Sequence, residues 1–218
     1  MKGLLVKEFR FMLGQKSSFL IFVALGLFFL LTGEDVSFGI MYTMIFASIF
    51  AASSITYDSH ENGMAFLLTL PIQKKGYVIG KYLFALAVIV SMGAIMCALA
   101  LGCNAFGGMA FEGDAIIESL VGAFTAAIVM ISLMIPIYII FGAEKARIAI
   151  MVIGGIGFAS FFILSKYASD SLAKLSGVLA KLESLSDLQS GLLITGIIVV
   201  ILAASMIISM VGLEKKEY

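Results

Sequence analysis

Charged residues are scarce in this sequence. Asp, Glu, Lys and Arg make up only 13% of the 218 residues, whereas hydrophobic types make up 61%. Soluble domains carry about 25% charged and roughly 45 to 50% apolar residues, so an ordinary soluble fold is excluded. The 14 basic and 14 acidic residues balance. The chain therefore has no strongly basic surface for nucleic acid, and we expect no nucleic-acid partner.

Cysteine and histidine are also rare. The only cysteines, Cys97 and Cys103, are separated by about 240° around one predicted helix, so we expect neither a disulfide nor a shared metal site. His60 is the only histidine. A zinc site needs three or four ligands, and we interpret His60 as a solvated loop residue. We expect no metal and no cofactor.

The sequence also lacks the motifs of the common hydrolases, G-x-S-x-G, H-E-x-x-H and paired intramembrane aspartates. The segment from Gly76 through Gly80 and Lys81 resembles a phosphate loop, but its spacing is one residue short. Tyr82 stands where the loop needs Ser or Thr. We therefore expect that the chain is not an enzyme and does not bind ATP itself.

Long apolar runs are what the sequence has in abundance. About 20 such residues form a helix that crosses a hydrocarbon core of about 30 Å. We predict an all-helical membrane protein with one transmembrane domain over residues 1–218, in which Pro136 kinks the fourth span. Its six spans are expected at residues 17–31, 38–57, 77–103, 116–141, 146–164 and 192–213.

Two further segments have helical periodicity but a more polar composition. Residues 1–16 alternate four basic residues with apolar ones, which predicts an N-terminal amphipathic helix at the membrane interface. In residues 165–189, leucines recur at spacings of three and four. We expect a second amphipathic helix there, resting on the outer leaflet, with a dimer seam as the alternative.

Basic residues are distributed unequally between the two sides of the predicted topology. With the N-terminus inside, the outer side has only Lys166, Lys174 and Lys181. The inner side has eleven basic residues: Lys2, Lys7, Arg10, Lys16, Lys74, Lys75, Lys81, Lys145, Arg147, Lys215 and Lys216. Cytoplasmic loops are enriched in Lys and Arg, so we predict that both termini are cytoplasmic.

Every charged residue falls in a loop or near the end of a predicted span. Proton-coupled carriers and voltage sensors need charges inside the membrane, so we expect neither function and an energy source outside this chain. We also predict close helix packing, because small residues let helices approach. The glycines concerned are Gly154, Gly155 and Gly157 in the fifth span, and Gly102 with Gly107 and Gly108 at the outer end of the third.

The segment between the second and third spans has the most specific pattern. A short amphipathic helix is expected from Asp58 to Leu70, where the following Pro71 ends it. This helix would lie at the cytoplasmic face and would present Phe66 and Leu67 together with Leu70.

This segment resembles the corresponding loop of the bacterial ABC-2 type permeases. In that family an E-N-G-like start leads to an apolar stretch, a Leu-Pro-[Ile/Val] turn, basic residues and a K-Y pair. The matching residues are Glu61, Asn62, Gly63, Leu70, Pro71, Ile72, Lys74, Lys75, Lys81 and Tyr82. The basic N-terminal helix, the six spans and the helical outer segment extend the resemblance over the whole chain.

The resemblance implies a permease subunit of an ATP-driven exporter in the bacterial cell membrane. Two such chains, identical or different, would pair and dock on separate ATPase subunits. We expect the ATPase contact at Glu61, Phe66, Leu67, Leu70 and Pro71, with Lys7 and Arg10 as a secondary contact.

The predicted spans offer only apolar, small or neutral polar lining, such as Ser48, Ser53, Thr125 and Ser132, which favours a hydrophobic or amphipathic substrate. The main alternative is a non-transporting assembly partner or sensor whose cytoplasmic loop binds a regulator.

Overall fold

The regular elements of the computed structural model are all α-helices in the residues that it describes, 2–32, 35–59, 63–64, 73–106, 111–167 and 187–216. They are α1 (Lys2–Gly14), α2 (Lys16–Thr32), α3 (Val36–Ser59), α5 (Lys74–Phe106), α6 (Gly113–Tyr167) and α8 (Asp187–Glu214). The predicted all-helical class is confirmed. The predicted spans at 17–31, 38–57 and 192–213 differ from α2, α3 and α8 by at most five residues at either end.

The helices do not all qualify as membrane spans by themselves. Helices α3, α5, α6 and α8 are long and apolar enough to cross a membrane. Helix α2 has 17 residues and meets this criterion only together with α1, to which it is bent by 64°. The described helices therefore give four or five candidate spans, whereas the sequence predicted six. The difference arises because the predicted fourth and fifth spans lie in one long helix, α6.

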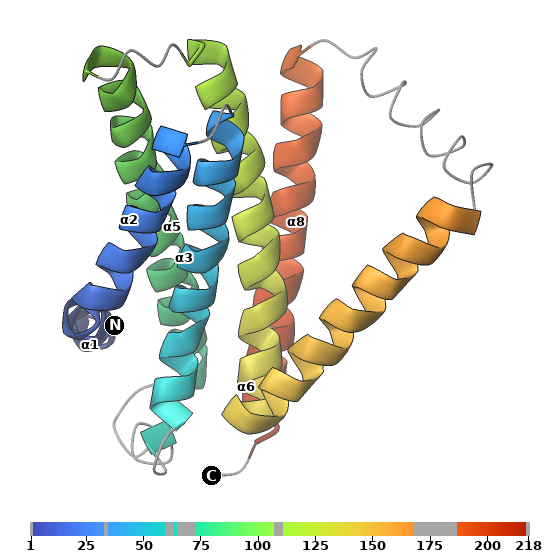
Figure 1. The fold of residues 1–218 in the computed structure, drawn as a ribbon. Coiled ribbons are helices and arrows are strands. Elements are labelled where there is room, and N and C mark those ends of the chain that lie inside the picture. The colour runs from blue at the N-terminus through green and yellow to red at the C-terminus, as the bar shows by residue number, and fades with distance from the viewer. Residues whose placement is uncertain are drawn as a thin grey trace.

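Helix α6 is sharply bent, and its two arms diverge in Figure 1. The bend lies at Gly142, whose φ of 76° and ψ of 170° are the only non-helical dihedrals in the element. The bend falls in the gap predicted between the fourth and fifth spans, at residues 142–145, and the separate kink at Pro136 stays a prediction. Glycine has no Cβ and adopts positive φ without the steric cost that other residues meet, so the chain turns at Gly142.

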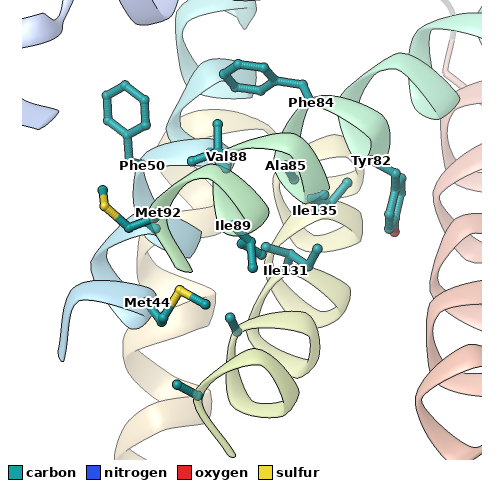
Figure 2. Close-up of a cluster of buried hydrophobic side chains, with 14 of the residues drawn as sticks. Met44, Phe50, Tyr82, Phe84, Ala85, Val88, Ile89, Met92, Ile131 and Ile135 are labelled. Carbon is teal, nitrogen blue, oxygen red and sulfur yellow. The ribbon is translucent and has the colours of Figure 1, made fainter. Parts of the chain in front are cut away.

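Helix α3 lies at the centre of the bundle and packs against α2, α5 and α6. The share of buried residues in the most apolar part of each helix decreases outward, from 61% in α3 to 6% in α8. Figure 2 shows the core where α3, α5 and α6 meet. Its side chains include Met44 and Phe50 of α3, Val88, Ile89 and Met92 of α5, and Ile131 and Ile135 of α6.

Close helix packing occurs at other glycines than those predicted, among them Gly26, Gly93 and Gly212. The predicted positions Gly107 and Gly108 lie outside the described residues, as do the surroundings of Gly157. A Cβ at Gly26 would lie 2.2 Å from the Thr43 hydroxyl oxygen, so α2 and α3 can approach this closely only because Gly26 has no side chain. At Gly102, Gly154 and Gly155 an added Cβ would meet nothing within 4 Å. Their predicted packing role is wrong for contacts within this chain.

Helix α1 turns an apolar surface outward. Leu5, Val6, Phe9 and Leu13 are each at least 40% exposed, whereas Glu8 is buried. This arrangement agrees with a helix that rests in the membrane interface. The second amphipathic helix stays a prediction, because residues 168–186 lie outside the described part of the chain.

Candidate functional site

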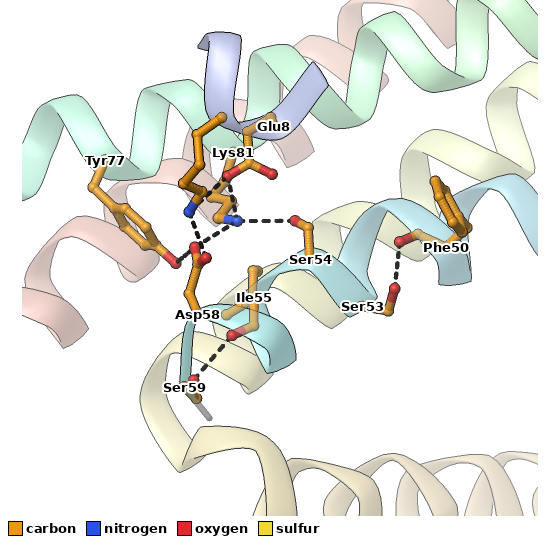
Figure 3. Close-up of polar contacts among 10 residues, drawn as sticks. Glu8, Phe50, Ser53, Ser54, Ile55, Asp58, Ser59, Tyr77 and Lys81 are labelled. Carbon is orange, nitrogen blue, oxygen red and sulfur yellow. Dashed lines mark hydrogen bonds and ion pairs between the residues drawn. The ribbon is translucent and has the colours of Figure 1, made fainter. Parts of the chain in front are cut away.

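Six polar side chains from three helices meet at one end of the bundle (Figure 3). We call them the ion-pair network: Lys7 and Glu8 of α1, Ser54 and Asp58 of α3, and Tyr77 and Lys81 of α5. The network joins segments that are up to 74 positions apart in the sequence, between Lys7 and Lys81. It connects the N-terminal helix to the two helices that flank residues 60–72.

Helical periodicity explains how α3 and α5 each supply two members. Ser54 and Asp58 are four residues apart, as are Tyr77 and Lys81, and residues at this spacing lie on the same face of a helix. Leu4 of α1 is also buried and packs in the apolar core beside Glu8. The inward face of α1 therefore carries both a leucine and a carboxylate.

Lys81 is the central cation of the network. Its Nζ lies 2.7 Å from Glu8 Oε1 and 2.7 Å from Asp58 Oδ2, and it donates a hydrogen bond of 2.9 Å to Ser54 Oγ. The same nitrogen lies 5.4 Å from the centre of the Tyr77 ring, within the range of a cation–π contact. The ammonium group thus contacts all three helices.

Asp58 is held from two further directions. The Lys7 ammonium donates to Asp58 Oδ1, and the Tyr77 hydroxyl donates to Asp58 Oδ2 over 2.9 Å. Lys7 Nζ also lies 3.2 Å from Glu8 Oε1. Both Asp58 oxygens therefore have partners, and the last turn of α3 is fixed to α1 and α5.

The network buries charge almost completely. Glu8 and Lys81 are each 1% exposed and Asp58 is 8% exposed. The prediction that the chain has no buried charge is therefore wrong for these three residues. Asp58 lies in the last turn of α3, Lys81 lies seven positions after the start of α5, and Glu8 lies in the middle of α1. These three parts of the chain meet and exclude solvent.

Two cations and two carboxylates make the network formally neutral. Burying charges is costly, and the mutual attraction offsets this cost only where all the groups are well paired. Removing one member of such a network leaves an uncompensated charge and typically costs about 3 to 5 kcal/mol. The arrangement is thus suited to fixing the relative positions of three helices.

A second contact ties the C-terminus of α8 to this end of the bundle. The Lys74 ammonium donates to the backbone carbonyls of Lys216, over 2.8 Å, and Glu214, over 3.4 Å. A cation near a helix C-terminus is stabilised by the helix dipole. The first turn of α5 is therefore joined to the end of α8.

A neutral polar cluster lies deeper between α5, α6 and α8. The Tyr82 hydroxyl shares hydrogen bonds with Ser205 and Ser209, and the Ser205 hydroxyl donates to the Ser132 carbonyl. Ser132 Oγ is buried and has no hydrogen-bond partner among the described residues. This cluster provides hydroxyl groups but no charge inside the bundle.

The site residues expected from the sequence divide into two groups. Glu61, Phe66, Leu67, Leu70 and Pro71 all lie outside the described residues, so the structure does not place them. Lys7 belongs to the ion-pair network, and Arg10 is exposed on α1.

The sequence interpretation missed the pairing of Glu8, Asp58 and Lys81. Their spacing within each helix was readable, since Asp58 follows Ser54 by four residues and Lys81 follows Tyr77 by four. The contact between the helices was not, because it depends on how α1, α3 and α5 converge.

Comparison with known families gives one match. The family model described as "ABC-2 family transporter protein" matches residues 3–214. Neither the curated proteins nor the solved structures give a match to this chain.

Proposed function

The chain belongs to the ABC-2 family of transporter proteins, and from this membership we propose that it forms the translocation path of an ATP-driven exporter. Membership makes the chain a multi-pass, non-catalytic membrane subunit of a transporter. The family implies an ATPase partner in general. Our proposal adds the topology, the route of coupling and the class of substrate, with the bacterial cell membrane as the location.

The proposed topology has six spans and two cytoplasmic termini. It counts α2 as a span and the two arms of α6 as one span each, since α6 is bent at Gly142. The tie between Lys74 and the carbonyl of Lys216 puts the start of α5 and the end of α8 on the same side. The basic residues expected inside favour the cytoplasm for that side.

The proposed route of coupling is the segment from Asp58 to Pro71. Closure of the ATPase would move Glu61, Phe66, Leu67 and Leu70, as an amphipathic helix seated in a groove moves with its partner. The observation that carries this proposal is the attachment of Asp58, the first residue of the segment, to Lys7, Tyr77 and Lys81. A displacement of the segment would thereby reach α1, α3 and α5 together.

The proposed substrate is hydrophobic or amphipathic. Among the polar residues first considered as lining, Ser53 and Thr125 each donate to a carbonyl of their own helix. Ser48 donates to its own helix and also to the Ala127 carbonyl of α6. Away from the ion-pair network, these residues and the Tyr82 cluster provide neutral polar groups inside the bundle. Outward transport follows the family resemblance. A second copy of this chain or a related chain would complete the path.

The double variant Glu61→Ala/Phe66→Ala tests the coupling. We expect it to insert and to accumulate normally, because neither residue lies in a span predicted from the sequence. The variant should lose substrate-stimulated ATP hydrolysis when the complex of permease and ATPase is reconstituted in liposomes. Normal stimulation by this variant would overturn the coupling role.

The matched control is Phe141→Ala/Glu144→Ala, which changes the same two residue types at the α6 bend. Phe141 is 52% exposed and Glu144 is also exposed, and the proposed topology puts both on the cytoplasmic side. We expect this control to keep most of the stimulated hydrolysis. An equal loss in both variants would mean that the segment from Asp58 to Pro71 is not the specific contact.

A further inference from the structure

A cavity of about 370 Å³ lies beside the ion-pair network, between α1 and α3. Glu8 and Asp58 line its buried side, and Arg10 and Tyr57 line its exposed side. The cavity also borders the edge-to-face pair of Phe11 and Tyr57, whose ring centres are 4.9 Å apart. It therefore extends from an aromatic, exposed edge to a buried carboxylate.

Two charged groups of the lining have unused bonding capacity. Glu8 Oε2 is buried and has no hydrogen-bond partner among the described residues, although Oε1 of the same carboxylate contacts two ammonium groups. Figure 3 shows this second oxygen without a contact. Arg10 has no ion pair in the described part of the chain. A buried polar atom without a partner is costly, so binding of a donor to this oxygen would be favourable.

We propose that this cavity binds the headgroup of an aminophospholipid, with the lipid phosphate on Arg10 and the lipid ammonium on Glu8 Oε2. A guanidinium group binds phosphate through paired N–H donors, which suits an exposed arginine at the cavity edge. An ammonium group provides the N–H donors and the positive charge that an unpartnered carboxylate oxygen needs. The two groups of the protein thus complement the two charges of one headgroup.

The surroundings favour a lipid over a protein partner. Leu5, Val6, Phe9 and Leu13 expose an apolar surface on the same helix that carries Arg10. A helix with this composition lies in the membrane interface, at the depth of the lipid headgroups. Pockets between helices near the membrane surface are a recognised mode of headgroup binding, and a lining with two cations and two carboxylates suits a zwitterionic headgroup.

This inference gives Arg10 a different partner from the one expected on sequence grounds. The sequence predicted that Lys7 and Arg10 form a secondary contact with the ATPase. The Lys7 ammonium, however, is already paired with Asp58 and Glu8. Arg10 is then the remaining cation in the lining of a cavity of about 370 Å³. The inference does not depend on the direction of transport or on the substrate.

The test compares two lipids whose headgroups carry the same charges but differ in N–H donors and in the size of the ammonium group. The full chain is purified in detergent and titrated with dioctanoyl phosphatidylethanolamine or dioctanoyl phosphatidylcholine, and native mass spectrometry counts the bound lipid. Both headgroups carry a phosphate and a positive charge, but choline has no N–H. We expect the ethanolamine lipid to bind about tenfold more tightly, the worth of one hydrogen bond to a charged group.

Three variants assign the contacts. Glu8→Gln should remove the preference for ethanolamine over choline, whereas Arg10→Gln should weaken both lipids about tenfold and leave the preference intact. Arg147→Gln, an exposed arginine of α6 outside the cavity lining, should change neither. Arg10 is exposed, so its substitution tests the phosphate contact even where Glu8→Gln disturbs the ion-pair network.

Several outcomes would overturn the inference. Equal affinity of the unaltered chain for both lipids would exclude the ammonium contact at Glu8. Binding of free phosphoethanolamine as tight as that of the lipid would identify a soluble ligand instead. If Arg10→Gln leaves lipid binding unchanged but lowers co-purification of the ATPase, Arg10 contacts the ATPase and the cavity is part of that interface.

Discussion

At the scale of single residues, Lys81 shows how a charge can lie inside an apolar helix. It is seven positions beyond the first residue of α5 and is followed by Tyr82, Leu83 and Phe84. An isolated ammonium there would lose its hydration without compensation. Glu8 and Asp58 supply that compensation from two other helices. The position of α1 and the charge of Lys81 are therefore interdependent.

Replacing Lys81 by Met should destabilise the protein strongly. The change keeps an unbranched side chain in the core but leaves Glu8 and Asp58 with Lys7 as their only cation. We expect a loss of about 3 to 5 kcal/mol, the range for breaking a buried ion pair by removing one partner. The measurement is the unfolding transition of the purified chain in detergent.

Lys75→Met is the matched control for this change. Lys75 Nζ lies 3.6 Å from Glu214 Oε1, and the two side chains are 64% and 49% exposed. An exposed pair of this kind contributes about 0 to 1 kcal/mol. Equal stability of the Lys75 and Lys81 variants would show that the ion-pair network does not stabilise the fold.

At the scale of elements, the bend of α6 decides how many times the chain crosses the membrane. The element has 55 residues and would be about 80 Å long as one straight helix, far more than a hydrocarbon core of about 30 Å. The non-helical dihedrals of Gly142 divide it into two arms. Each arm then has a length close to one crossing.

Substitution of Gly142 by Ala tests the importance of this bend. An added Cβ would meet nothing within 4 Å, so the substitution acts through the backbone and not through a clash. A non-glycine residue at a φ of 76° carries strain of about 1 to 3 kcal/mol, which a straighter helix would relieve. Spin labels at Ile117 and Val152, one on each arm, should report a longer or broader distance distribution in this variant.

Gly154→Ala provides the control for the same substitution in helical backbone. Its added Cβ also meets nothing within 4 Å, but the residue lies in the second arm of α6 with ordinary helical dihedrals. Alanine is a better helix former than glycine, so stability should stay the same or rise by up to about 1 kcal/mol. An unchanged distance in both variants would mean that other contacts hold the two arms apart.

At the scale of the whole molecule, apolar run length predicted the helices well. The first apolar run ends one residue before the end of α2, at Thr32. The last run begins five residues after the start of α8, at Asp187. This succeeds because the spans are local and each backbone must satisfy its own hydrogen bonds in lipid. The bend at Gly142 falls in the gap predicted between the fourth and fifth spans, but the positive φ that produces it is visible only in three dimensions.

The candidate site could be predicted only in part for a related reason. Lys81 and Tyr82 were recognised as a family-like pair in the sequence, and Asp58 as the start of the cytoplasmic segment. Glu8, the second carboxylate that pairs with Lys81, lies in a helix that composition alone indicates is a surface element. Contacts between distant segments depend on the angle of 64° between α1 and α2, which no local pattern encodes.

Cysteine labelling on intact cells tests the arrangement of the whole chain. In a Cys97→Ala/Cys103→Ala background, cysteine at Gly33 or Gly108 should react with an impermeant thiol reagent, and cysteine at Gln73 or Lys216 should react only after the cells are permeabilised. The reason is the excess of basic residues predicted for the inner side.

The pattern of labelling also tests the fold, in addition to the orientation of the chain in the membrane. Lys74 bonds the carbonyl of Lys216, so positions 73 and 216 must lie on the same side whichever way the chain inserts. If all four results were reversed, the chain would be inserted in the opposite orientation with the same fold. A difference between Gln73 and Lys216 would instead contradict the tie between α5 and α8.

The two outer positions test the number of spans between them. Two long helices, α3 and α5, separate Gly33 from Gly108 among the described residues. Labelling of only one of these two positions would therefore contradict two crossings between them.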